Sequence, residues 1–305
     1  MEVSPSTSGQ GALVAPTAAG RVQQVVRDYV ALTKPKVQSL LILTTVSAMF
    51  VAGTPDVLLV FLTCLGGYLS AGGAGAVNHW YDRDIDGQME RTADRPIPSG
   101  RVSPNAALIF GISLAVASFV LMSLTINVLA ASLALAGFLG YVFVYTMWLK
   151  RTTPQNIVIG GAAGAFPPLV GWAAVTGTLS GTALFMFAIV FFWTPPHFWA
   201  LSILMKEEYA KVNVPMLPVV RGEDETRRQI LLYTVLLYAV TQLPFCVEGF
   251  GTFYLVASLS LGLVFIGGAV RLYRRADRRS ALVLYLYSLL YLALLFAAMV
   301  VDARI

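Results

Sequence analysis

The chain has 305 residues, of which 57% are apolar and only 12% are charged, whereas an ordinary soluble domain has roughly 25% charged residues. With a mean hydropathy of +0.73, it lacks the polar surface that a water-soluble fold of this size needs. The composition therefore excludes an ordinary soluble protein and places the chain in a lipid bilayer, and we expect no nucleic-acid partner for its +5 net charge. The two cysteines both lie in apolar stretches and give little support to a disulfide framework, and the two histidines exclude a multi-histidine metal centre.

The N-terminal segment differs from the rest of the chain. Its first 20 residues are rich in Ser, Gly, Ala, Thr and Pro, and no basic residue precedes Arg21. This composition lacks the apolar centre of a signal peptide and the early arginines of a transit peptide. We predict a disordered cytoplasmic tail over residues 1–30, a membrane domain over 31–305, and a bacterial inner membrane as the location.

Apolar runs recur through the remainder of the chain. Each is close to the 20 or so residues that a helix needs to cross a bilayer. The nine runs are 37–53, 57–79, 105–124, 127–148, 156–176, 182–205, 229–247, 250–270 and 281–301. The sequence thus predicts an all-α membrane protein with nine transmembrane helices.

The basic residues define an orientation for these nine helices. Of the 21 lysines and arginines, 20 fall in segments that share one face, and only Arg304 falls on the other. The positive-inside rule makes the shared face cytoplasmic, with the C-terminus on the opposite side. The long connections after the second and sixth helices lie on the cytoplasmic face, where we expect the chemistry.

The end of the second helix carries the most informative pattern. Asn78, Asp82 and Asp86 are four residues apart, so on a continuing helix they form one stripe, while Asp84 points away. Oxygen donors of this kind suit Mg²⁺, which commonly joins one or two carboxylates to a substrate phosphate. Small residues before the stripe, such as Gly67 and Gly75, predict close helix packing. The alternative interpretation is that these aspartates only form a solvated, charged helix end.

Basic residues follow on the same predicted face. Arg91 and Arg95 come directly after the stripe, and Lys150 with Arg151 ends the fourth helix. Lysine and especially arginine bind phosphate oxygens, so these four residues are candidate diphosphate ligands. Alternatively, they only obey the positive-inside rule.

These segments together resemble a known family. The stretch NHWYDRDIDGQMERTADRPIPSG over 78–100 looks like the first signature of the UbiA-type intramembrane prenyltransferases. LTKPK at 32–36 and NIVIGG at 156–161 match in the same order, as do TPPHFW at 194–199 and VPMLP at 214–218. The last two segments are similar to the branch of the family that modifies heme.

The resemblance implies a fold and an activity. The nine helices would surround a central cavity capped by cytoplasmic loops. The expected reaction joins the farnesyl group of farnesyl diphosphate to a vinyl group of heme B and adds water, giving heme O and diphosphate. Mg²⁺ is the implied cofactor, and a downstream heme A-forming enzyme is a candidate partner.

The resemblance also assigns two further groups of residues. His197, within TPPHFW, becomes a candidate heme contact, as an iron ligand or a propionate partner. The family commonly carries a second aspartate-rich motif after the sixth helix, where this chain has Lys206, Glu208 and Tyr209. Glu208-Tyr209 is the nearest match to that second cytoplasmic motif.

Two other functions compete with this interpretation. A prenyltransferase for an aromatic or quinone precursor would use the same stripe, and TPPHFW argues against it. A cation-linked membrane transporter would place ionisable residues at mid-membrane on several helices, whereas the charges here gather at one face.

Overall fold

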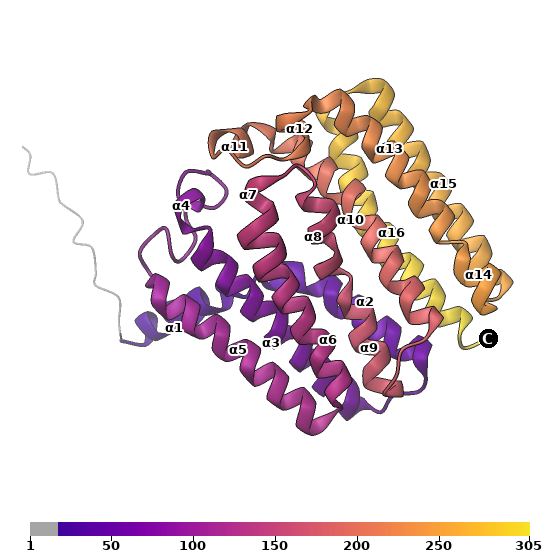
Figure 1. Ribbon diagram of the computed structural model, residues 1–305, viewed down its shortest axis with the longest axis horizontal. Helices are drawn as coiled ribbons and strands as arrows, with labels where there is room; N and C mark the ends of the chain where they lie inside the picture. The colour runs from indigo at the N-terminus through magenta and orange to yellow at the C-terminus, as the bar shows by residue number, and fades with distance from the viewer. Residues whose placement is uncertain (1–17) are drawn as a thin grey trace, which may run out of the picture.

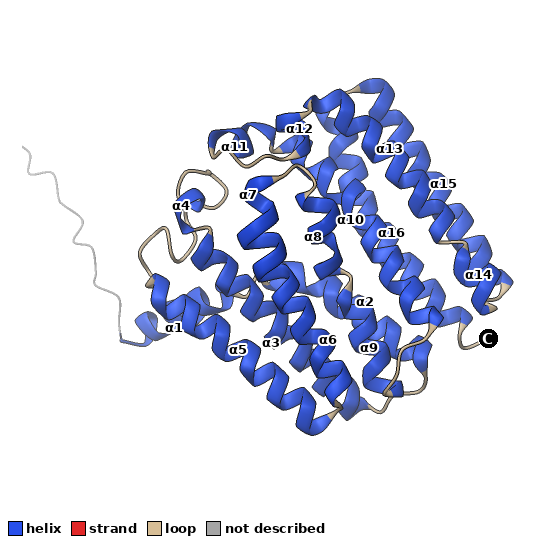
Figure 2. Ribbon diagram, viewed as in Figure 1, coloured by secondary structure: helices blue, strands red, loops and turns tan. Residues whose placement is uncertain are grey.

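The computed structural model describes residues 18–305, which form helices and connecting loops with no strand among them (Figures 1 and 2). The first half comprises α1 (Ala18–Leu32), α2 (Pro35–Ala52), α3 (Val57–Tyr81), α4 (Arg83–Asp86), α5 (Pro104–Thr125), α6 (Val128–Leu139), the π-helix η1 (Gly140–Leu149) and α7 (Lys150–Thr152). The second half comprises α8 (Asn156–Gly164), α9 (Phe166–Thr176), α10 (Gly181–Leu204), α11 (Lys206–Lys211), α12 (Leu217–Val220), α13 (Gly222–Val240), α14 (Leu243–Glu248), α15 (Thr252–Arg275) and α16 (Arg278–Asp302).

Within the described residues, nine helical segments are long and apolar enough to cross a membrane, which confirms the predicted all-α class and span count. Three spans are built from more than one helix, and one of them, the seventh, Gly222–Glu248, joins α13 to α14. The fourth, Val128–Thr152, joins α6 to α7 through η1, and the fifth, Asn156–Thr176, breaks between α8 and α9. Pro167 and Pro168 explain the break in the fifth span, because proline fits the first turn of a new helix and not the interior of an old one. The protein is a multi-pass membrane protein.

The prediction of disorder up to residue 30 is wrong for residues 18–30, which belong to α1; residues 1–17 lie outside the described part. Val22, Val25, Val26, Tyr29 and Val30 recur at helical spacing, so α1 is amphipathic. Tertiary contacts that could not be predicted from the local sequence hold the C-terminal end of α1. The Tyr29 ring meets Phe110 edge-on at 4.9 Å, and buried Asp28 accepts a hydrogen bond from Arg101 Nε at 2.9 Å.

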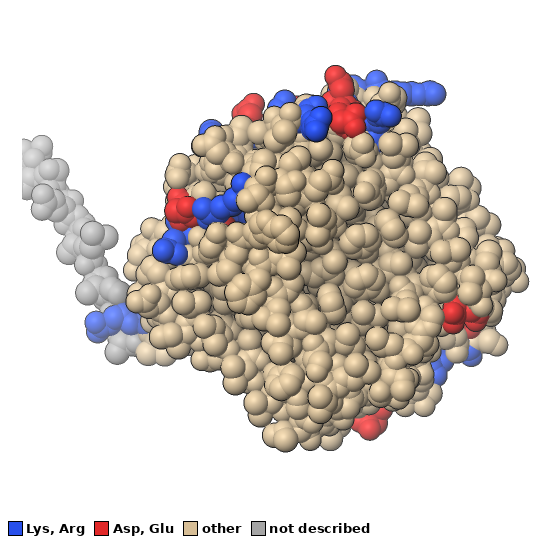
Figure 3. Space-filling view, in the orientation of Figure 1, with Lys and Arg blue, Asp and Glu red and all other residues tan. Residues whose placement is uncertain are grey.

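The spans form a closed arrangement. Each packs against its neighbours along the chain, and the last helix, α16, packs against both α10 and the first span, α2. In Figure 1, α13 and α15 lie at one side of the bundle and α3 and α5 at the other. The charged side chains of the visible face lie mostly along one end, above a broad uncharged belt (Figure 3).

Close packing between α3 and α5 fixes the helix that carries the predicted stripe. A methyl group built on Gly73 would lie 2.5 Å from the Gly111 carbonyl oxygen, and one on Gly111 would lie 2.8 Å from Val77 Cγ2. Gly75 approaches the Leu32 carbonyl, whereas Gly67 has open space around it. The predicted packing role therefore holds for Gly75, is absent at Gly67, and is strongest at Gly73.

Replacing Gly73 tests this contact. We expect Gly73→Ala to lower the free energy of unfolding by about 1–3 kcal/mol, the usual cost of overpacking, because the obstructing atom is backbone. Gly67→Ala, on the same helix, removes a helix-weakening glycine without a clash and serves as the matched control. Thermal unfolding of both purified variants in detergent measures the difference, and equal melting temperatures would contradict the packing argument.

Candidate functional site

The predicted stripe exists across the junction of α3 and α4. The Asp82 N–H donates to the Asn78 carbonyl and the Asp86 N–H donates to the Asp82 carbonyl, each at 2.9 Å. The four-residue spacing therefore stays helical, although Asp82 itself lies between the two helices. Asn78, Asp82 and Asp86 are 3%, 0% and 3% exposed, so a solvated helix end is excluded. The Asn78 amide also donates to Asp82 Oδ2 at 2.8 Å.

Cations from separate segments pair with this stripe. Lys150 Nζ binds Asp82 Oδ2, and Arg151 reaches the other Asp82 oxygen at 3.3 Å. Arg95 binds Asp86 Oδ2 at 2.7 Å. Buried carboxylates need such partners because unpaired charge is costly away from water. The structure thus brings together the predicted residues Arg95, Lys150 and Arg151.

The π-helix η1 supplies further contacts to the stripe. Its Thr146 Oγ1 accepts a hydrogen bond from the Asn78 amide at 3.2 Å, and the Tyr141 hydroxyl lies 3.4 Å from Lys34 Nζ. The Met147 carbonyl accepts from Tyr81. Single π-helical turns often occur at functional sites, because the wider turn redirects side chains.

Lys34 is a central cation that the candidate list from the sequence did not include. It lies between α1 and α2 with a left-handed φ of 54°, a conformation uncommon outside glycine. Its ammonium donates to Asn78 Oδ1 at 2.6 Å. Burial, and after it the charges of Arg95 and Lys150, lower the Lys34 pKa to about 7. An anion bound nearby would therefore favour the charged form of Lys34.

Asp84 points away from the stripe, as predicted. Its side chain is 57% exposed and accepts two hydrogen bonds of 2.7 Å from Arg151. These hydrogen bonds are the main reason that the Asp84 pKa lies below its usual value. Arg151 therefore bridges the buried Asp82 and the exposed Asp84.

The second cytoplasmic motif contacts the loop after α4. Glu208 Oε2 accepts the Glu90 backbone N–H at 2.9 Å, so this carboxylate ties α11 to the loop after α4. Tyr209 is partly buried against the core, desolvation raises its pKa, and the nearby Arg91 opposes that rise. Lys206 pairs with Glu223 at 3.2 Å and makes no described contact with the stripe.

His197 lies apart from the stripe, at the contact between α10 and α16. Its ring is stacked against Trp193, with 4.2 Å between centroids, and against Tyr285, at 4.9 Å. Nδ1 is 2.7 Å from the Ser288 hydroxyl. Both ring faces and one nitrogen are thus occupied by protein, which leaves the Nε2 edge for any ligand.

The stripe suits magnesium by the chemistry of its donors. No group of three His, Cys, Asp or Glu side chains within residues 18–305 forms a ready metal cluster. Mg²⁺ does not require one, since it binds one or two carboxylates and completes its shell with water and substrate phosphates. Asn78, Asp82 and Asp86 supply an amide and two carboxylates, so the residues present fit this ion.

The fold and this cluster define a membrane-embedded protein with paired carboxylates and cations at one end of its bundle. Residues 40–300 match the UbiA prenyltransferase family, and the chain belongs to this family. It is 55% identical over 280 residues to a protoheme IX farnesyltransferase of Roseiflexus sp. (strain RS-1), covering 91% of this chain and 52% of that protein. It is 54% identical over 283 residues to the protein of that name from Symbiobacterium thermophilum, covering 92% and 95%. The chain spans about half the length of several curated relatives it matches, including the Roseiflexus protein.

Solved structures share the fold at low sequence identity. One, concerned with digeranylgeranylglyceryl phosphate synthase in membranes, superposes with a TM-score of 0.76 at 20% identity, covering 92% of this chain and 99% of that chain. A UbiA homologue from Archaeoglobus fulgidus bound to DMAPP and Mg²⁺ superposes with a TM-score of 0.70 at 17% identity, covering 89% and 99%. The nine-span architecture is thus that of the UbiA fold.

The pairing of Asp82 can be tested without substrate. Lys150→Met should lower the free energy of unfolding by about 3 kcal/mol, because it leaves a fully buried carboxylate with the neutral Asn78 amide and only the longer Arg151 ion pair. Arg83→Met, which removes an exposed cation that lies over the Trp80 ring, is the control and should change stability little. Denaturant unfolding in detergent measures both. An equal loss in the two variants would argue that Asp82 does not depend on its partner.

Proposed function

We propose that the protein transfers the farnesyl group of farnesyl diphosphate to a vinyl group of heme B, with addition of water, to give heme O and diphosphate. The observation that carries this proposal is the buried stripe of Asn78, Asp82 and Asp86 within a cluster of cations. Relatives bearing the name protoheme IX farnesyltransferase, more than 50% identical over nearly the whole chain, support the choice of acceptor.

In this reaction, the stripe and its cations hold the diphosphate. Bound Mg²⁺, held by Asn78, Asp82 and Asp86, would neutralise the leaving group. Lys150, Arg151 and Arg95 already lie at the carboxylates and would bind phosphate oxygens, whereas Arg91 forms no ion pair with the stripe. Concentrated positive charge favours cleavage of the allylic carbon–oxygen bond, since negative charge develops on the diphosphate.

The loops near the site would keep water away from the farnesyl cation. The hydrogen bond between Glu208 and the Glu90 backbone holds α11 against the loop after α4. Partly buried Tyr209, which interacts electrostatically with Arg91, adds a second link between the same segments. We therefore assign Glu208 and Tyr209 to closing this end of the bundle and not to a second metal site. Lys206, paired with Glu223, supports α11 from outside.

We also propose that His197 contacts heme through Nε2. The Ser288 hydroxyl donates to the Tyr285 carbonyl, so Nδ1–H can donate to Ser288 Oγ and leave Nε2 unprotonated, as in the outer contacts that orient metal-bound histidines. The proposed orientation places the stripe and its loops in the cytoplasm of a bacterium, following the distribution of lysine and arginine. Heme O would then pass to a heme A-forming enzyme.

A direct assay tests the reaction. Purified protein in detergent is incubated with heme B, farnesyl diphosphate and Mg²⁺, and heme products are examined by mass spectrometry. We expect an adduct that carries farnesyl plus water and that disappears when EDTA replaces Mg²⁺. If heme stays unmodified while an aromatic acid or quinone precursor is prenylated, heme B is not the acceptor.

Asp86 and Asp84 provide a matched pair of variants, because each is ion-paired with an arginine at 2.7 Å but only Asp86 belongs to the stripe. Asp86→Asn should reduce turnover at least about 100-fold, the scale of losing one electrostatic contact to the reacting group. Asp84→Asn, which alters an exposed carboxylate outside the stripe, should retain most activity. Rates at saturating heme B decide between them, and similar losses in both variants would remove the special role of the stripe.

A further inference from the structure

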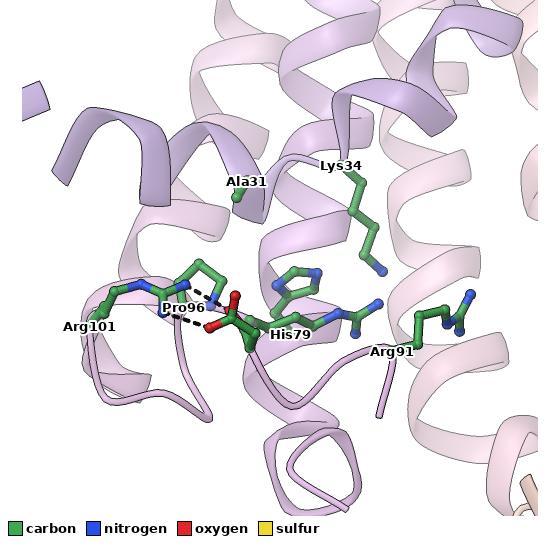
Figure 4. A pocket seen from close by; sticks show the side chains of 8 residues that line it. Ala31, Lys34, His79, Arg91, Pro96 and Arg101 are labelled. Atoms are coloured by element: carbon green, nitrogen blue, oxygen red, sulfur yellow. Dashed lines mark hydrogen bonds and ion pairs between the residues drawn. The ribbon is translucent and has the colours of Figure 1, made fainter. Parts of the chain in front are cut away.

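A cavity of about 360 Å³ lies beside the stripe, between the end of α1, the end of α3 and the loop after α4. Figure 4 shows the His79 ring within it, with Lys34 and Arg91 on one side and Arg101 on the other. Arg95 and Asp94 also line it. The lining thus has three arginines, one lysine, one histidine and one carboxylate, so its chemistry selects an anion.

His79 is the unexplained group in this cavity. The residue is 3% exposed, and neither Nδ1 nor Nε2 has a hydrogen-bond partner in the described structure. A neutral imidazole carries one donor and one acceptor, and buried polar groups in native proteins are nearly always paired. Packing alone does not account for an imidazole here, because phenylalanine would fill the same space without unpaired nitrogens.

Most of the surrounding cations are already occupied. Lys34 binds Asn78, and Arg95 binds Asp86. Arg101 binds Asp28 and Asp94. Arg91 has no carboxylate partner within residues 18–305, and it lies near the hydroxyl of Tyr209. Arg91 and His79 are therefore the groups that a ligand would engage.

The position of the cavity separates it from the stripe. His79 follows Asn78 and projects about 100° around α3 from it, and neither Asp82 nor Asp86 lines the cavity. An anion bound here would make no metal bridge to those carboxylates. A carboxylate suits such a metal-independent site, and heme B presents two of them as propionates on an apolar ring.

We propose that this cavity is the carboxylate subsite for the acceptor, in which the His79 N–H and the Arg91 guanidinium hold one propionate of heme B. The subsite orients the ring so that a vinyl group reaches the farnesyl carbon at the stripe. The identity of the acceptor rests on the proposed function, whereas the affinity for a carboxylate rests on the cavity itself.

The test compares heme B with heme B dimethyl ester, which lacks the carboxylates. Both are titrated by absorbance into the full-length protein in detergent with EDTA present. We expect the wild type to bind the diacid about tenfold more tightly than the diester, on the scale of a hydrogen bond to a charged group. His79→Phe should abolish that preference while keeping the melting temperature, because His79 has no protein partner to lose.

Two variants complete the design. His79→Gln keeps a donor and should retain part of the preference, and Arg83→Met, outside the cavity, should leave it unchanged. In the farnesylation assay, His79→Phe should raise the KM for heme B about tenfold and leave the KM for farnesyl diphosphate unchanged. If His79→Phe does not fold, the subsite is tested by the affinities of the wild type and of His79→Gln for the diacid and the diester.

Several results would overturn the subsite. Equal affinity of the wild type for diacid and diester would do so. An equal loss of both in His79→Phe would point to iron ligation, and a raised KM for farnesyl diphosphate alone would point to the diphosphate. If wild type and His79→Phe farnesylate diacid and diester equally, the subsite fails and the proposed function stands. If heme is never farnesylated but the His79-dependent preference remains, the proposed function fails and the subsite stands.

Discussion

The structure depends on the burial of two carboxylates at the end of a membrane helix. Asp82 and Asp86 are almost inaccessible to water, and each buried charge costs several kcal/mol unless it is paired. The partners come from distant parts of the chain: Lys34 reaches Asn78 from the segment before α2, Lys150 and Arg151 come from α7, and Arg95 comes from the loop after α4. Satisfying the stripe therefore assembles this end of the bundle.

The packing of the helices places the cations next to the stripe. The contact between Gly73 and Gly111 lets α3 and α5 approach closely and positions the end of α3, which carries the stripe. The π-helix η1 turns Tyr141 and Thr146 toward Lys34 and Asn78. The contact of α16 with α2 closes the bundle, so the segments that carry the cations are anchored on a continuous set of packed helices. The cation-rich cluster then favours a ligand with several negative charges.

Features that depend on periodicity and composition could be predicted from the sequence. The nine spans follow from apolar run lengths, and the register of Asn78, Asp82 and Asp86 follows from helical spacing that survives the α3–α4 junction. Features that depend on tertiary contacts could not. The helix α1 was not predicted, because the segment before it has a composition typical of disorder. Its position depends on the ion pair between Asp28 and Arg101. The sequence shows Lys34 in LTKPK but not the left-handed turn that aims it at Asn78. Likewise, nothing local indicates that Glu208 binds the Glu90 backbone or that His79 faces a cavity.

The most direct test is an experimental structure of the protein with Mg²⁺ and an unreactive thio analogue of farnesyl diphosphate. We predict a metal ion against Asp82 and Asp86, with Lys150 and Arg151 turned from those carboxylates toward the diphosphate oxygens. The cavity around His79 should hold no diphosphate. A diphosphate bound in that cavity or elsewhere, with the ion pairs of Asp82 and Asp86 intact, would contradict the account.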